Sequence, residues 1–234
     1  YIVNPYKVSP PAVAPTLSFD FSIDDNWIFN NSDAWIDTTA KTLNIKCSKD
    51  GNKQAAIYPF SIDSITLETK WVLRAYNINW QQDDNYGQCL LGFTDLDQTE
   101  SESQNHYGVA GLFFAGSEGG VMGGYLNLEG WKNTCQYCPN EVLVVYTGTN
   151  AFSSNDPSWV ELSMDEGTLT SKFFDNDDFD SSPVATNTYD SYTAEQSTNT
   201  TYLSLKNFAV DIGVGFTMQL SIDELKFWNG VSEV

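Results

Sequence analysis

The chain has 234 residues, and 31 acidic side chains against 11 basic ones give it a formal net charge of −20 at pH 7. This charge excludes a nucleic-acid binder, because neutralising phosphates takes clustered Lys and Arg, and it argues against docking on anionic lipid. The single histidine, His106, excludes a multi-histidine metal site. No apolar run approaches 18 residues, so we expect no insertion into a membrane.

Residues 1–15 differ in composition from the rest. Tyr1–Val8 is short and apolar, and Ser9–Pro15 contains three prolines, which make it stiff and extended. Two interpretations stay open: a disordered leader, or an arm that lies outside its own domain and adds a strand to a neighbouring sheet. The chain begins at Tyr1 without a signal-peptide pattern, which we interpret as a processed chain or an excised domain.

From Thr16 onward, short apolar runs alternate with Gly, Asn, Asp and Ser clusters, which is typical of an all-β protein. No run has helical spacing, and nothing after Pro15 divides the chain, so residues 16–234 are predicted to be one domain: a two-sheet antiparallel β-sandwich, or jelly roll. The predicted strands are Leu17–Ile23, Thr42–Cys47, Gln54–Phe60, Ser64–Asn77, Gln88–Thr94, His106–Ala115, Gly120–Leu128, Glu141–Thr147, Ser158–Asp165, Thr168–Asp175, Thr201–Phe208 and Gly215–Trp228.

The last predicted strand changes the parity of its apolar positions. Leu220 and Ile222 are even, whereas Leu225 and Phe227 are odd. A strand has a side-chain period of two, so this change predicts a β-bulge at Asp223 and Glu224. The bulge either aims one of these acids at a specific place or only bends the strand.

Three segments resemble concanavalin A-like (laminin G-like) jelly rolls. Ser221–Val231 reads SIDELKFWNGV and resembles their final strand; Leu17–Trp27 reads LSFDFSIDDNW and resembles their opening strand; Ser158–Val184 is similar to their late hairpin. The order of the segments matches that of the family. The resemblance implies that residues 16–234 form one such domain, with a role in recognising glycans or partner proteins outside cells; some relatives are glycosidases.

Calcium is the metal that this acidic composition favours, because it takes six to eight oxygen ligands. The resemblance implies that the first and last strands are neighbours and that a structural calcium binds there, at Asp20 and Asp24, or Asp25 as the alternative, with Asp223. A weaker candidate is the acidic loop with Asp175 and Asp177, which lacks the glycine and the final glutamate of an EF-hand.

Four cysteines allow three pairings. A zinc ribbon needs two Cys-x-x-Cys pairs, and this chain has one, so we do not expect zinc. We expect instead a local disulfide between Cys135 and Cys138 and a second one between Cys47 and Cys89. Disulfides, together with the glycosylation acceptor patterns at Asn30 and Asn199, favour a location outside the cell or on its surface.

A retaining glycosidase needs two carboxyl groups about 5–5.5 Å apart. The Glu-x-Asp-x-Glu of laminarinase-like relatives is absent; Glu161 and Asp165 come nearest, without the middle carboxylate. We therefore expect no catalysis. Glycan binding would use exposed aromatic rings beside Asp and Asn. The candidates in predicted loops are Trp80, Tyr86, Trp131, Asp83 and Asn85.

The sequence thus predicts a non-catalytic extracellular β-sandwich that binds a glycan or a partner protein surface. The alternative is a structural subunit of an extracellular filament, coat or surface layer, joined to its neighbours through residues 1–15. A glycoside hydrolase is the third hypothesis.

Overall fold

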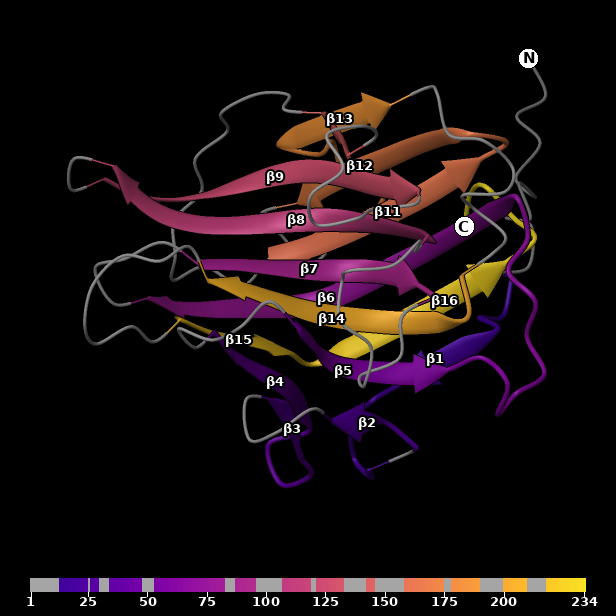
Figure 1. Ribbon diagram of the computed structural model, residues 1–234, viewed down its shortest axis with the longest axis horizontal. Coiled ribbons are helices and arrows are strands. Elements are labelled where there is room, and N and C mark those ends of the chain that lie inside the picture. Colours follow the sequence, from indigo (N-terminus) through magenta and orange to yellow (C-terminus); the bar gives the residue numbers. More distant parts are fainter. Residues whose placement is uncertain are drawn as a thin grey trace, which may run out of the picture.

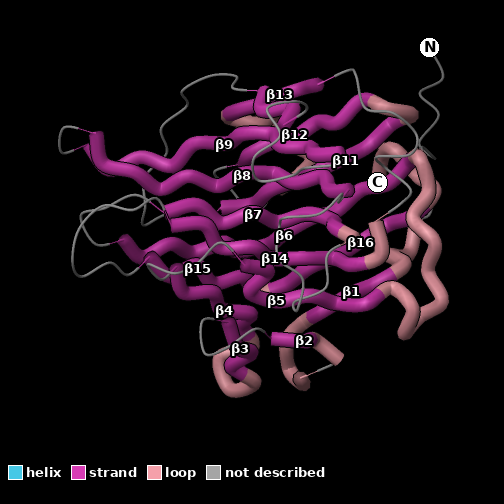
Figure 2. The backbone as a smooth tube through the Cα atoms, viewed as in Figure 1, coloured by secondary structure: helices cyan, strands magenta, loops and turns pink. Residues whose placement is uncertain are grey.

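The structure is a computed structural model that describes residues 13–24, 26–29, 34–47, 53–82, 87–95, 107–118, 121–132, 142–145, 158–174, 178–189, 200–209 and 218–234. The described residues form strands, turns and irregular segments without any helix (Figures 1 and 2), so none of them contains a helix that could cross a membrane. This confirms the all-β fold class.

The larger sheet has the strand order β13-β12-β11-β6-β15-β4-β3, and β16 joins it by pairing with both β6 and β1. Its strands are β1 (Leu17–Phe19), β3 (Ala34–Asp37), β4 (Thr42–Cys47), β6 (Lys70–Gln82), β11 (Ser158–Asp165), β12 (Thr168–Phe174), β13 (Ala185–Tyr189), β15 (Met218–Ile222) and β16 (Glu224–Asn229).

The second sheet has the order β10-β9-β8-β7-β14-β5-β2. Its strands are β2 (Ile28–Phe29), β5 (Lys53–Pro59), β7 (Gly87–Thr94), β8 (Tyr107–Glu118), β9 (Val121–Lys132), β10 (Val142–Val145) and β14 (Tyr202–Ala209). Figure 1 shows this sheet in front of the larger one, with their strands crossing at an angle. The described pairings are antiparallel, which confirms the predicted two-sheet sandwich.

Aromatic rings from both sheets form the centre of the core. Trp71 in β6 and Phe227 in β16 contact Phe93 of β7 across the sandwich, with ring centroids 4.6 Å and 5.3 Å apart. Phe60, which follows β5, lies 5.7 Å from both Phe93 and Phe227. All four side chains are almost completely buried, and such burial stabilises a fold by about 1.5–3 kcal/mol for each large apolar side chain.

Most predicted strands are confirmed, two of them with their predicted bounds: Thr42–Cys47 and Ser158–Asp165. The predicted strand Ser64–Asn77 was placed too early, since β6 spans Lys70–Gln82 and Ile65 and Leu67 precede it. Three strands were missed because they are short or polar: β2, β3 and β13.

The change of face at Asp223 is confirmed. Leu220, Ile222, Leu225 and Phe227 are all fully buried, and Asp223 separates β15 from β16. Both strands pair with β6, and one register holds across the break, because Ser221 faces Asn79 and Glu224 faces Tyr76. The predicted extra residue is therefore not an insertion relative to β6.

Strand β6 changes face at the same level as its partner. Ala75 and Ile78 are both fully buried, and between them Asn77 has φ of +50°. On its other side β6 pairs with β11, and there the register shifts between Ser158 and Val160. The irregularity is thus shared by β6 and its partner strands β15 and β16, which keep one register. The register shift falls between β6 and β11.

Asn77 is the position where this shared irregularity can be tested. We expect N77V to be less stable than N77G by about 1–2 kcal/mol, because both lose the amide but only valine pays the steric cost of the left-handed region. Urea unfolding of both variants measures the difference. Equal unfolding free energies would contradict the left-handed conformation of this residue.

Candidate functional site

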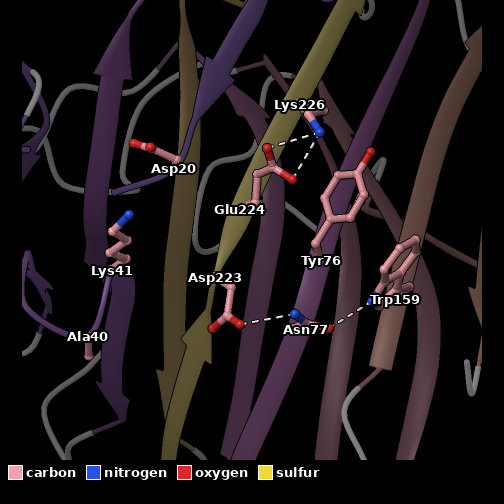
Figure 3. A pocket seen from close by; sticks show the side chains of 9 residues that line it. All are labelled: Asp20, Ala40, Lys41, Tyr76, Asn77, Trp159, Asp223, Glu224 and Lys226. Carbon is pink, nitrogen blue, oxygen red and sulfur yellow. Dashed lines mark hydrogen bonds and ion pairs between the residues drawn. The ribbon is translucent and has the colours of Figure 1, made fainter. Parts of the chain in front are cut away.

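A hollow of about 590 Å³ opens on the outer face of the larger sheet, opposite the core. It forms because, on the edge away from β6, no strand pairs with Asp223 and Glu224: β1 ends at Phe19, which faces Leu225, and β4 pairs with β15 only up to Ile222. The side chains lining the hollow are labelled in Figure 3: Asp20, Ala40, Lys41, Tyr76, Asn77, Trp159, Asp223, Glu224 and Lys226.

A chain of hydrogen bonds orients Asp223. Trp159 Nε1 donates to Asn77 Oδ1 over 2.9 Å, and Asn77 Nδ2 donates to Asp223 Oδ2 over 3.0 Å (Figure 3). The backbone N–H of Asp223 donates to the carbonyl of Tyr76 over 3.1 Å. Within the part of the chain that the structure describes, Asp223 Oδ1 accepts no hydrogen bond. This oxygen remains an acceptor for a ligand in the hollow.

Asp20 lies on the opposite side of the hollow, in the turn after β1. Its Oδ1 accepts hydrogen bonds from the Ser22 hydroxyl over 2.7 Å and from the Ser22 amide over 3.1 Å. These two bonds, with a smaller contribution from the charge of Lys41, hold the pKa of the Asp20 carboxyl below its ordinary value. Asp20 is therefore a fixed negative charge at neutral pH.

Lys226 and Tyr76 form the third part of the hollow. Lys226 Nζ is 2.9 Å from Glu224 Oε1 and 4.6 Å from the centre of the Tyr76 ring. Burial raises the pKa of the half-buried Tyr76 phenol, against the opposing charges of Lys226 and Arg74. Tyr76 is thus a neutral hydroxyl beside a cation that is already paired.

Trp159 is held from behind by other rings. It meets Tyr76 edge to face at a centroid distance of 4.7 Å and lies 4.7 Å from Phe179, which follows β12. Phe179 in turn packs on Phe174 at 5.1 Å and carries the Arg74 guanidinium over its ring at 4.3 Å. The wall of the hollow is therefore a packed aromatic cluster, and its polar edge is fixed through Asn77.

Two cations hold the Glu161 carboxylate beneath this cluster. Arg74 donates to Glu161 Oε2 over 2.8 Å, and Lys172 donates to Oε1 over 2.8 Å. The Glu161 side chain is only 8% exposed, so both bonds lie in a partly desolvated place. Asp165 pairs with Lys70 at 3.0 Å. Both carboxylates that come nearest to the glycosidase pattern thus take part in ion pairs.

The structure brings together part of the predicted calcium site. Asp20 and Asp223 line the same hollow, whereas Asp24 is exposed and does not line it. The described residues contain no group of three His, Cys, Asp or Glu arranged to hold a metal ion, and Lys41 lines the hollow beside Asp20. Calcium binding at Asp20, Asp24 and Asp223 stays a prediction. Asp175 and Asp177 lie outside the described residues.

Two of the predicted glycan-binding residues, Trp80 and Trp131, are described, and they lie in different sheets. Trp80 lies in β6 and Trp131 in β9, so neither is a loop residue, because both strands extend further than their apolar alternation indicates. Trp80 lies near the end of β6, whereas Trp131 lies near the end of β9 and faces Gly108 of β8. Asp83, Asn85 and Tyr86 lie outside the described residues.

The predicted disulfides and glycosylation positions stay predictions. Cys47 lies in β4 of the larger sheet and Cys89 in β7 of the second. The structure describes the backbone of these two residues but not their side chains. Cys135, Cys138, Asn30 and Asn199 also lie outside it.

The predicted N-terminal arm is described only from Val13 onward. The Val13 carbonyl accepts a hydrogen bond from Trp228 Nε1 over 2.8 Å, so the described end of the arm lies beside β16. Whether residues 1–12 join a neighbour stays a prediction.

The aromatic wall and the Asn77 amide that links it to Asp223 were not predicted from the sequence. A signal was present: Trp159 and Tyr76 occupy the outward positions of strands whose inward neighbours, Val160 and Ala75, are buried. An aromatic residue on the polar face of a strand indicates packing against another surface element or a ligand.

The sequence matches no protein-family model and no curated protein. The fold, in contrast, resembles solved structures. A CBM2 module of the evolved Dit protein from Lactobacillus casei BL23 phage J-1 has a TM-score of 0.57 at 8% identity, over 94% of this chain and 98% of that one. A legume lectin-like domain from Entamoeba histolytica has a TM-score of 0.55 at 14% identity, over 93% and 99%.

A xylan β-1,4-xylosidase from Bacillus halodurans C-125 is similar with a TM-score of 0.57 at 9% identity, over 94% of this chain and 40% of that enzyme. This chain thus spans about two fifths of the xylosidase. The likenesses show that the fold is a concanavalin A-like jelly roll, as the resemblance of the three segments implies.

Glu161 provides a stability test of the outer face. We expect E161Q to lower the free energy of unfolding by about 3 kcal/mol, because it leaves Arg74 and Lys172 without their partly buried counter-charge. E166Q is the matched control, since Glu166 is exposed and its ion pair with Lys70 is worth under about 1 kcal/mol. Chemical unfolding curves measure both. Equal losses in the two variants would contradict a special role for Glu161.

The calcium prediction is tested by thermal unfolding. If calcium binds at Asp20 and Asp223, a concentration 100-fold above its dissociation constant stabilises the chain by about 2.7 kcal/mol, a shift of several degrees in Tm. D223A abolishes the shift, and D24A reports on the third predicted ligand. Identical melting curves with chelator and with excess calcium would rule out the site.

Proposed function

We propose that this chain is a non-catalytic carbohydrate-binding domain that acts outside the cell and that the hollow beside Trp159 contacts the glycan. The observation that carries the proposal is the geometry of the hollow. An oriented carboxylate, a half-buried phenol and a fixed indole converge on one open depression of the outer face.

These are the groups that recognise a sugar. Carboxylates such as Asp223 accept hydrogen bonds from sugar hydroxyls, and the phenol of Tyr76 both donates and accepts. The ring of Trp159 offers an apolar surface beside them, which suits the mixed polar and apolar faces of a pyranose. Asp223 and Trp159 are held by hydrogen bonds to Asn77, so little side-chain freedom is lost when a ligand binds.

The comparisons support the proposal at the level of the fold. A carbohydrate-binding module and a lectin-like domain share the jelly roll and are covered almost completely by this chain. A xylosidase shares it as well, so the proposal that this domain is not catalytic rests on the ion pairs of Glu161 and Asp165. The extracellular location is proposed from the same neighbours.

Glycan array screening followed by isothermal titration tests the proposal. We expect binding to at least one glycan, weakened about tenfold or more in W159A, because an aromatic residue at the centre of a binding site carries a large share of the affinity. W35A is the matched control, since Trp35 is partly buried on the edge strand β3 and does not line the hollow.

Two results would contradict the proposal. A folded chain that binds no glycan removes it altogether. Glycan binding that W159A leaves intact, in a variant whose melting curve matches the parent, moves the site away from the hollow.

A further inference from the structure

Resting on this proposed function, we infer that the hollow selects uncharged, hydroxyl-rich glycans and rejects glycans that carry carboxylates, with Asp223 as the residue that discriminates. The inference depends on how the charges of the hollow are paired. Three carboxylates and two ammonium groups line it: Asp20, Asp223, Glu224, Lys41 and Lys226.

One of the two ammonium groups, that of Lys226, is held in an ion pair. Lys226 is bound to Glu224 at 2.9 Å and covers the Tyr76 ring. Lys41 lines the hollow beside Asp20 (Figure 3), and its charge contributes less than the two hydrogen bonds from Ser22 to lowering the pKa of that carboxyl. An anionic ligand would therefore compete with Glu224 for Lys226.

Asp223 has no such partner among the described residues. Its Oδ2 accepts a hydrogen bond from the neutral amide of Asn77. Its Oδ1 is left for a donor on a ligand in the hollow. A sugar hydroxyl satisfies Asp223 Oδ1 by donating, whereas a uronate brings a second carboxylate without a proton to share. Two like charges at close range repel, and the formal charge of −20 on the chain acts in the same direction.

The experiment compares sugars that differ only at C6. The probes are hexasaccharides of β-1,4-linked glucose and β-1,4-linked mannose, each with its counterpart in which every C6 is a carboxylate. Calorimetry at 20 mM salt measures the affinities. We expect the neutral member of a pair to bind about tenfold tighter, and the ratio to fall at 500 mM salt, because screening shortens the range of the repulsion.

D223N separates charge from shape. Asparagine keeps an oxygen that can accept from Asn77 but carries no charge. We expect the preference for the neutral sugar to shrink to about twofold or less in D223N. D24N is the matched control, because it removes one exposed aspartate that does not line the hollow and should leave the preference unchanged. Melting curves confirm that both variants fold.

The outcomes are distinct. Equal or tighter binding of a carboxylated sugar by the parent chain overturns the inference and leaves the proposed function intact. A preference that D223N and D24N change equally also overturns it, since the effect then comes from the total charge. Failure of every probe, neutral and carboxylated, overturns both the inference and the proposed function for these sugars.

Discussion

The contact between Asn77 and Asp223 is the constraint on which the outer face depends. A single strand with an extra residue turns its apolar side chains away from the core, which costs more than the local hydrogen bonds can return. Here β6 and its partner ribbon make the change together, so Ala75 and Ile78, and likewise Ile222 and Leu225, all stay buried. β6 keeps one register with β15 and β16, and the register shift occurs instead between β6 and β11.

This shared irregularity also decides where the surface is open. Asp223 interrupts the ribbon between β15 and β16, and the strands that cover its far edge, β1 and β4, stop on either side of the interruption. The hollow is the space between their ends. The Asp223 carboxylate therefore lies where β15 ends and β16 begins, beside the irregular residue Asn77 of β6.

Much of this fold follows from the sequence, because most strands alternate clearly between apolar and polar residues. The strand β6 shows where such reasoning fails. Ile65 and Leu67 continue its alternation, yet they precede the strand, because Asn229 binds their segment from a distant part of the chain. Its side chain accepts from the Glu68 amide at 2.9 Å and donates to the Thr66 carbonyl at 2.8 Å. A contact across about 160 positions leaves no local pattern.

The candidate site, too, could be predicted from the sequence only in part. Asp223 is predictable, because the change of parity lies within one strand. Its partners are not, since Asn77 and Trp159 come from β6 and β11, and only the order of the strands in the sheet brings them together. The loop residues proposed from composition alone, Asp83, Asn85 and Tyr86, fall outside the described residues.

The clamped indole of Trp159 has a consequence for how fast the surface can work. Its ring is fixed by Tyr76 and Phe179 and its N–H by Asn77, so the free and the occupied forms of the wall should share one rotamer. A ligand can then bind without a prior rearrangement of the protein. The lifetime of the complex depends on the strength of the contacts between ligand and protein. Under the proposed function, such a surface would suit brief, repeated attachment along a glycan polymer, where many short-lived contacts add up through proximity.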